Sequence, residues 1–363
     1  MKEQTKVRFS PEISDRLFFL EFLKAISITS VVSYHAIFVP RSTFIINNGI
    51  LETLFAPFRF CVPVFLTISF LLFERQIAQS SIQSKLPLLK KRLIRLVIPT
   101  LFWFTVATGL KIINGNSHTE IINAILKGEI FTGAYYLLIV LQLMPIFILI
   151  RNWLNQPKNI FVTITIQGLV FLSTYATICG FFGNQILAFL VEMERPLIIY
   201  WFVYIALGIY IYKNFSWIEN KSRSLSKTNK ILIICCTAAI MAIEYKILTS
   251  LLDTLRPFDY AAFSCILSVP AMFICFASIK ENDLPSPAVK ITKLLSKYSL
   301  GIFCINGILA QIFLSIGTKI FSQANFSLSQ IIAIKIIGWI ILLTISLLLS
   351  MLLKRMGLKR VVC

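Results

Sequence analysis

Three ionisable side chains share one face of the first apolar stretch, and their spacing suits acid–base chemistry. Lys24 and His35 are eleven residues apart, which at about 100° per residue falls about 20° from a whole number of helical turns. Both side chains therefore point the same way from one helix, about 16 Å apart along its axis. Glu21 precedes Lys24 by three residues, a spacing that allows a direct ion pair on that face.

The setting of these side chains favours a functional role. They lie in an apolar run from about Leu17 to Val39, where a central lysine costs about 2.5–3.5 kcal/mol on insertion scales. Two structural alternatives stay open. Glu21 and Lys24 would form an ion pair that only locks helices together, and His35 would be a hydrogen-bonded core histidine.

A basic segment, KLPLLKKRLIRLVIPT, offers a second kind of site. Arg92 and Arg95 are three residues apart and share a helix face, and guanidinium groups bind phosphate oxygens in pairs. They predict either a cradle for a cytosolic phosphate-bearing ligand or a surface for anionic lipid headgroups. For Lys90 and Lys91, topology and contact with lipid headgroups are the favoured interpretation.

Further polar residues open or follow the next apolar runs. Arg59 lies near the outer end of the second run, where it either snorkels to the interface or contacts a ligand. Ser69 lies deeper and would bond a backbone carbonyl or a ligand. Tyr135 and Tyr136 open the fourth run, which fits the aromatic belt of a membrane interface.

Composition predicts the elements that position these residues. Of 363 residues 57% are hydrophobic, and apolar runs of about twenty residues are long enough to cross about 30 Å of hydrocarbon. The predicted fold class is all-α, a polytopic integral membrane protein of about ten transmembrane helices. One transmembrane domain is expected over residues 1–363, without an appended soluble domain. The predicted spans are 17–39, 54–73, 96–113, 135–151, 160–180, 196–212, 230–251, 259–279, 298–318 and 329–353.

The distribution of basic residues predicts the orientation. With the N-terminus inside, 25 of the 35 Lys and Arg residues fall in cytoplasmic segments, 6 lie outside and 4 lie within spans. The positive-inside rule therefore favours cytoplasmic termini and an even number of spans in a plasma or inner membrane. The net charge of +19 follows from this distribution, so no nucleic-acid partner is expected. Two histidines without an HExxH spacing, and eight cysteines without a CxxC pair, predict no metal site.

The order of these features resembles the membrane acyltransferase type 3 family, whose members O- or N-acylate surface glycans and other acceptors. The family opens with an acidic-x-x-Arg/Lys segment followed by ten residues and a histidine, which Glu21, Lys24 and His35 match. Its next cytoplasmic loop carries Arg-x-x-Arg shortly before a proline, matched by Arg92 and Arg95. The likeness covers about residues 15–355.

Other motifs of the family match in part. Arg59 and Ser69 correspond to an Arg and a Ser-Gly-Phe/Tyr of the second span, but the glycine is missing. The segment 135–138, Tyr-Tyr-Leu-Leu, stands where Tyr-His-Leu-Trp is expected. Near the end of the chain, Asn306 stands where a histidine is common.

The resemblance implies an enzyme that moves an acyl group from cytosolic acyl-CoA to a hydroxyl of a glycan or lipid-linked sugar. Acetyl-CoA is the expected donor, membrane lipids are the surrounding partners, and no metal is involved. Donor binding is expected at Arg92 and Arg95, which would face the nucleotide phosphates of CoA, and at Arg59 and Ser69.

The resemblance also assigns catalytic roles to His35, Lys24 and Glu21. His35, kept neutral by its apolar setting, would take the proton of the acceptor hydroxyl as it attacks the thioester. Glu21 would orient Lys24, which would hold a polar group of the donor. An acyl-histidine intermediate is a second route.

Two other classes of function stay open. Intramembrane charges also line the path of a transporter or flippase for a lipid-linked or anionic solute, which would not turn over acyl-CoA. A non-catalytic membrane scaffold would keep its function after His35→Ala. Acyl-CoA turnover, and its loss when His35 is changed, separates the three classes.

Overall fold

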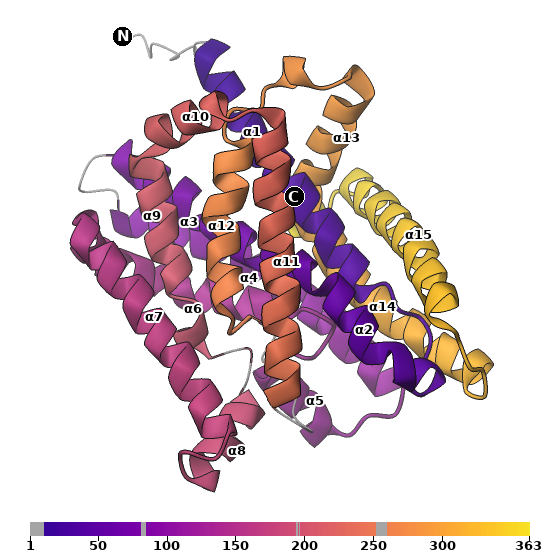
Figure 1. The fold of residues 1–363 in the computed structure, drawn as a ribbon. Helices are drawn as coiled ribbons and strands as arrows, with labels where there is room; N and C mark the ends of the chain where they lie inside the picture. Colours follow the sequence, from indigo (N-terminus) through magenta and orange to yellow (C-terminus); the bar gives the residue numbers. More distant parts are fainter. Residues whose placement is uncertain (1–10, 81–84, 194, 196, 252–259) are drawn as a thin grey trace.

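The computed structural model describes residues 11–80, 85–193, 195, 197–251 and 260–363, and in these ranges all regular elements are helical (Figure 1). The predicted all-α class is confirmed. Helices suit hydrocarbon because they bond every backbone N–H and C=O within one segment. The longest helix in each predicted span is, in chain order, α1 (Pro11–His35), α3 (Cys61–Ala78), α4 (Lys85–Ile113), α6 (Tyr135–Ile150), α7 (Pro157–Ile178), α9 (Val203–Lys213), α11 (Lys227–Leu251), α12 (Phe263–Phe276), α14 (Ser299–Phe321) and α15 (Leu328–Arg355).

The number of helices that cross the membrane is smaller by length and composition than the ten predicted. Among the described residues six helical segments are long and apolar enough, or seven if the bent pair Ile198–Lys213 and Phe215–Ser224 is one span. Helices α6 and α12 are apolar but shorter, and α1 is not among the six. The chain is thus a multi-pass helical protein, and the count of ten stays a prediction.

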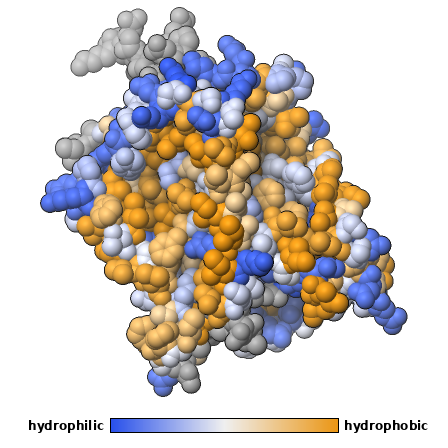
Figure 2. Space-filling model, in the orientation of Figure 1, coloured by the Kyte–Doolittle hydropathy of each residue, from blue (hydrophilic) through white to orange (hydrophobic). Residues whose placement is uncertain are grey.

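Several helices turn apolar side chains outward. In the most apolar 18-residue stretch of α4, α11 and α15, only 22%, 17% and 22% of the residues are buried inside the protein, whereas in α14 the share is 56%. Figure 2 shows hydrophobic residues over the middle of one face and hydrophilic residues gathered at its top. Such a band is the surface expected where lipid surrounds a bundle.

The two ends of the bundle carry different connecting helices. Helices α10 (Phe215–Ser224) and α13 (Ser286–Lys297) lie at one end, and α5 (His118–Leu126) and α8 (Asn184–Met193) lie at the other (Figure 1). The first pair comes from loops predicted to be cytoplasmic and the second from outer loops. At the start of α5, the hydrogen bond from the Ser117 backbone N–H lowers the pKa of the Glu120 carboxyl.

Helix α1, which carries the candidate catalytic residues, lies inside the bundle. It packs against α3, α13, α14 and α15. Its Leu23, Ile28 and Val32 are fully buried, so its apolar side chains meet protein. The neighbouring helices therefore shield the polar residues of α1 from lipid, which lowers the cost of holding them at this depth.

An ion pair ties α3 to the end of α6. Arg151 donates to both carboxylate oxygens of Glu74, at 2.6 and 2.7 Å, and the Glu74 side chain is only 2% exposed. A bidentate pair of this kind fixes direction as well as distance. It holds in place two helices that line the cavity described next.

Candidate active site

His35, the last residue of α1, is held by an amide from α14. Its Nδ1 lies 2.7 Å from Oδ1 of Asn306, which is fully buried. The Nδ2 group of Asn306 donates to the carbonyls of Ile302 and Phe303, each at 2.7 Å. Because carbonyls only accept, these two bonds turn Oδ1 toward the imidazole, so Nδ1 carries the proton. In the neutral ring the lone pair then lies on Nε2, the atom that a general base would use.

A cavity of about 190 Å³ lies between α1, α3, α4, α6 and α14. Its polar lining includes Lys24, Ser69 and Tyr136, and Leu96 and Phe303 are among its apolar walls. No hydrogen bond or ion pair joins the Lys24 side chain to another residue that the structure describes. With Ser299, the polar lining of the cavity comprises one ammonium-bearing side chain and three hydroxyl-bearing ones.

The wall of this cavity meets His35 at Gly133. The Phe303 ring lies 5.3 Å from the Tyr136 ring. A Cβ added at Gly133 would lie 3.2 Å from Phe303 Cζ and 3.4 Å from His35 Cε1, and Gly133 has a φ of +91°. Both the close approach and the left-handed backbone favour glycine here. Phe303, which lines the cavity, and His35 therefore both lie beside Gly133.

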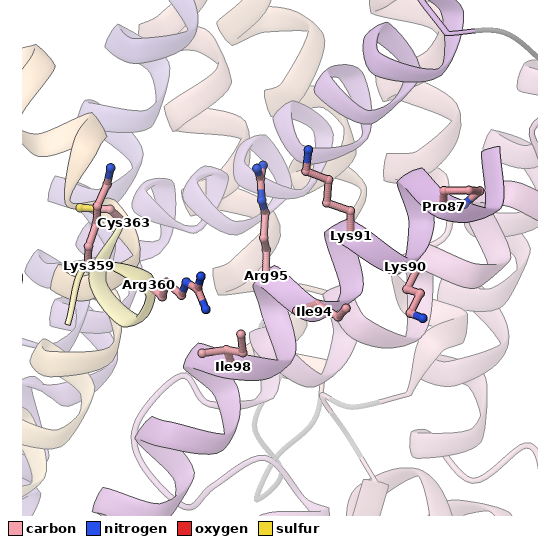
Figure 3. Close-up of a pocket in the computed structure, with 9 residues that line it drawn as sticks. All are labelled: Pro87, Lys90, Lys91, Ile94, Arg95, Ile98, Lys359, Arg360 and Cys363. Carbon is pink, nitrogen blue, oxygen red and sulfur yellow. The ribbon is translucent and has the colours of Figure 1, made fainter. Parts of the chain in front are cut away.

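The two arginines of the basic segment lie in different surroundings. Arg92 points inward: its Nη1 donates to the Ser69 carbonyl at 2.7 Å, and its guanidinium lies 4.8 Å from the Phe73 ring centre. It is also an electrostatic neighbour of Lys24. Arg95 is exposed and lines a second, larger cavity (Figure 3). The pair shares a helix as predicted, but its members are split between an internal contact and an open site.

Arg59 does not snorkel to the interface. Its side chain is only 4% exposed; it donates to the Tyr34 hydroxyl and lies 4.1 Å from the centre of the Tyr245 ring. Lys335 on α15 also binds Tyr34, because its Nζ donates to the Tyr34 carbonyl at 3.2 Å. Two buried cations thus bind the residue that precedes His35 in the chain.

The cavity also corrects the interpretation of the tyrosine pair. The Tyr136 hydroxyl lies within hydrogen-bonding reach of Ser69, whose own hydroxyl donates to the Phe65 carbonyl at 3.0 Å. Tyr135 is buried and lies 5.5 Å from the Arg195 guanidinium. Neither ring belongs to an interfacial belt, because both turn into the protein.

Glu21 lies apart from the other site residues. Its charged neighbours are Lys293 and Glu281, which pair with each other at 2.7 Å, as well as Lys24. Within the described part of the chain no direct ion pair forms between Glu21 and Lys24. The spacing that allows the pair is present, but the carboxylate turns toward α13.

Asn306 and Tyr136 lie closer to the site than their sequence motifs predict. In the sequence Asn306 is a departure from the histidine that is common at its position, and in the structure it is the residue that contacts the imidazole. The available signal was physical: an amide two turns into a buried helix must find partners. For Tyr136 the signal is its place in the segment 135–138, where the resemblance expects a histidine, because a tyrosine at a helix start otherwise looks the same at an interface and in a cavity.

A family model described as an acyltransferase domain matches residues 17–355, a range that contains all of the site residues above. No curated protein matches the chain. No solved structure matches it either.

Proposed function

The chain belongs to the acyltransferase 3 family, and we propose that it moves an acyl group from cytosolic acyl-CoA to a hydroxyl of a glycan or lipid-linked sugar. Among acyl-CoA donors, we propose acetyl-CoA. One observation carries the proposal: the bond between His35 Nδ1 and Asn306 Oδ1 sets the lone pair of the neutral ring on Nε2. The comparisons give no support to the transporter alternative.

The reaction needs one base and a path for the donor. His35 Nε2 takes the proton of the acceptor hydroxyl while its oxygen attacks the thioester carbon. The C–S bond breaks, the thiolate of CoA leaves, and the imidazolium returns its proton to that sulfur. Asn306 keeps the proton on Nδ1 throughout, so each cycle starts from the same tautomer.

Lys24 acts on the donor rather than on the reacting carbon. Helix geometry places it about 16 Å from His35 along α1, too far to stabilise an oxyanion formed beside the imidazole. In the cavity its ammonium would hold an amide carbonyl of the pantetheine arm, beside Ser69 and Tyr136. The thioester would then lie past Phe303, toward His35.

Arg92 and Arg59 position residues along the donor path without contacting the donor themselves. Arg92 holds the Ser69 carbonyl and so fixes one wall of the cavity. Arg59 binds the hydroxyl of Tyr34 and positions the end of α1. Arg95 remains the arginine of the basic segment that a cytosolic ligand can reach directly.

The test compares thiol release from acetyl-CoA by protein in nanodiscs, wild type beside His35→Ala and His35→Gln. We expect both variants to lose about 10²–10⁴-fold in kcat and to keep CoA binding. The chain offers a matched control in His118→Gln, because His118 is its other histidine and is exposed on α5. That variant should equal wild type.

Two results would overturn the proposal in different ways. Turnover that survives both His35 substitutions would remove His35 as the base while leaving an acyltransferase. Absence of CoA binding and turnover in the wild type would remove the acyltransferase proposal itself.

A further inference from the structure

We propose that α16 (Lys359–Val362) completes a phosphate-binding site on α4, and that this site takes the nucleotide phosphates of the donor. The inference rests on the proposed function, because CoA is its source of phosphate. The site is a cavity of about 770 Å³ between the start of α4 and α16. Its charged lining comes from two segments far apart in the sequence: Lys90, Lys91, Arg95, Lys359 and Arg360.

These five side chains gather positive charge in one hollow, which Cys363 also lines. None of them makes an ion pair or hydrogen bond with another residue that the structure describes, and no Asp or Glu lines the cavity. Like charges gathered in one hollow repel each other, and an anion with several charges relieves that repulsion. Guanidinium forks and ammonium groups are the groups that proteins use to bind phosphate.

The cluster is held in place by the packing of α16. The indole N–H of Trp103 on α4 donates to the Val361 carbonyl at 2.9 Å. Val361 and Val362 are 5% and 0% exposed, and a Cβ at Gly301 would lie 2.9 Å from Val362 Cβ. Lys359 and Arg360 therefore project from an anchored turn.

Figure 3 shows how the cations are directed. Lys91 and Arg95 extend from one face of α4, and Arg360 reaches from α16 toward α4. Lys90 extends the other way, in keeping with its expected contact with lipid headgroups. The proposed phosphate ligands are thus Lys91, Arg95, Lys359 and Arg360.

The basic cavity and the smaller one flank the same turn of α4. Arg95 and Ile98 line the basic cavity, and Leu96 lines the cavity that holds Lys24. A ligand for both needs phosphates at one end and an uncharged arm at the other. CoA has this form, whereas a lipid headgroup supplies the phosphate without the arm.

The test uses the full chain with Lys359→Gln and Arg360→Gln together, in nanodiscs of phosphatidylcholine. The donors are acetyl-CoA and acetyl-pantetheine, which lacks the nucleotide and its phosphates. We expect the KM for acetyl-CoA to rise about tenfold or more at unchanged kcat, because uniform binding is lost. With acetyl-pantetheine the variant should match wild type.

Controls separate this effect from general loss of charge or fold. Arg355→Gln removes an exposed cation at the end of α15 that does not line the cavity, and should leave both KM values unchanged. The double variant keeps Val361 and Val362, so its thermal unfolding should match wild type. Binding of adenosine 3′,5′-bisphosphate is measured in parallel and should weaken in the double variant.

Three results would overturn the inference. An unchanged KM for acetyl-CoA in an active double variant would remove the site and leave the proposed function intact. A defect seen only in discs containing phosphatidylglycerol would assign the cluster to a lipid headgroup. Equal binding of the bisphosphate by wild type and variant would remove the site even where no transfer is detected.

Discussion

At the residue scale the proposed chemistry depends on an uncharged partner for the imidazole. Asn306 accepts from Nδ1 and is itself fixed by two backbone carbonyls, so it orients His35 without adding a negative charge. An amide stabilises the imidazolium less than a carboxylate would. A thioester is an activated acyl donor, and its reaction asks for less from the base than hydrolysis of an amide.

Replacing Asn306 tests this arrangement. Asn306→Leu removes the acceptor at Nδ1, so both tautomers are populated and kcat should fall about 10–100-fold with little change in the KM for acetyl-CoA. Asn306→Asp keeps an oxygen toward Nδ1 and should recover part of the loss. An unchanged kcat in Asn306→Leu would show that Asn306 only fills the core.

Lys24 should lower the stability of the folded protein, and we expect it to be kept because donor binding requires it. Lys24→Met removes an ammonium with no bonded partner among the described residues, so the free energy of unfolding should rise by about 1–3 kcal/mol. The kcat/KM for acetyl-CoA should fall at least tenfold.

The comparison variant is Arg151→Met. It leaves the buried Glu74 carboxylate without its ion-pair partner and should lower the free energy of unfolding by about 3–5 kcal/mol. Thermal unfolding and acetyl-CoA turnover are measured for both variants. A Lys24→Met variant less stable than wild type would contradict the view of Lys24 as an unpaired cation kept for donor binding.

At the element scale, the sequence predicts where helices lie better than which way they face. Each predicted span contains a helix, because a run of apolar residues directly reports the length that hydrocarbon requires. The side of a helix that faces the protein is harder to predict, because a helix that is apolar all round has little periodicity in its hydrophobic residues. Arg92 and Arg95 show the result: one turn of α4 separates an inward contact from an open cavity. That split depends on α3 and α16, which the local sequence does not specify.

The contact between α14 and the segment before α6 gives a test at this scale. A Cβ at Gly307 would collide with the Thr132 carbonyl and lie 2.8 Å from the Phe131 ring. Gly307→Ala should therefore push the segment 131–133 away from α14, including Gly133 beside His35. We expect a loss of about 1–3 kcal/mol in unfolding free energy and a lower kcat.

The control for this change is another helical glycine with open surroundings. Gly109 on α4 has nothing within 4 Å of an added Cβ, so Gly109→Ala should leave turnover unchanged and hold or raise stability. Thermal unfolding in detergent and acetyl-CoA turnover report on both variants. Equal behaviour of the two alanines would mean that the α14 contact does not position the site.

At the scale of the whole molecule, α1 links the two sides of the reaction. Its Lys24 lies in a cavity near the basic end of α4, and its last residue, His35, carries the proposed base. The distance of about 16 Å between them is about half of a 30 Å hydrocarbon layer. A donor that enters from the cytoplasm would therefore deliver its acyl group well into the membrane, where a lipid-linked acceptor can arrive from the other side.

This picture requires that the two ends of the bundle face opposite compartments, which two exposed cysteines can test. Cys179 caps α7 at the predicted outer end, and Cys363 follows α16 at the predicted cytoplasmic end. An impermeant maleimide should label Cys179 in right-side-out vesicles and Cys363 in inverted ones. Cys179→Ser and Cys363→Ser identify each signal by its loss.

The outcome turns on the short helices between the two cysteines. Helix α12 has only 14 residues, and α9 is long enough only when it is counted together with α10. The sequence predicts five spans between the two cysteines, an odd number that places them on opposite sides. If α12 fails to cross while the other four do, both cysteines face one compartment and label from the same side. Opposite labelling therefore supports an odd number of spans between the two cysteines and a cytoplasmic basic cavity. Labelling from one side would contradict the topology and would separate that cavity from cytosolic CoA.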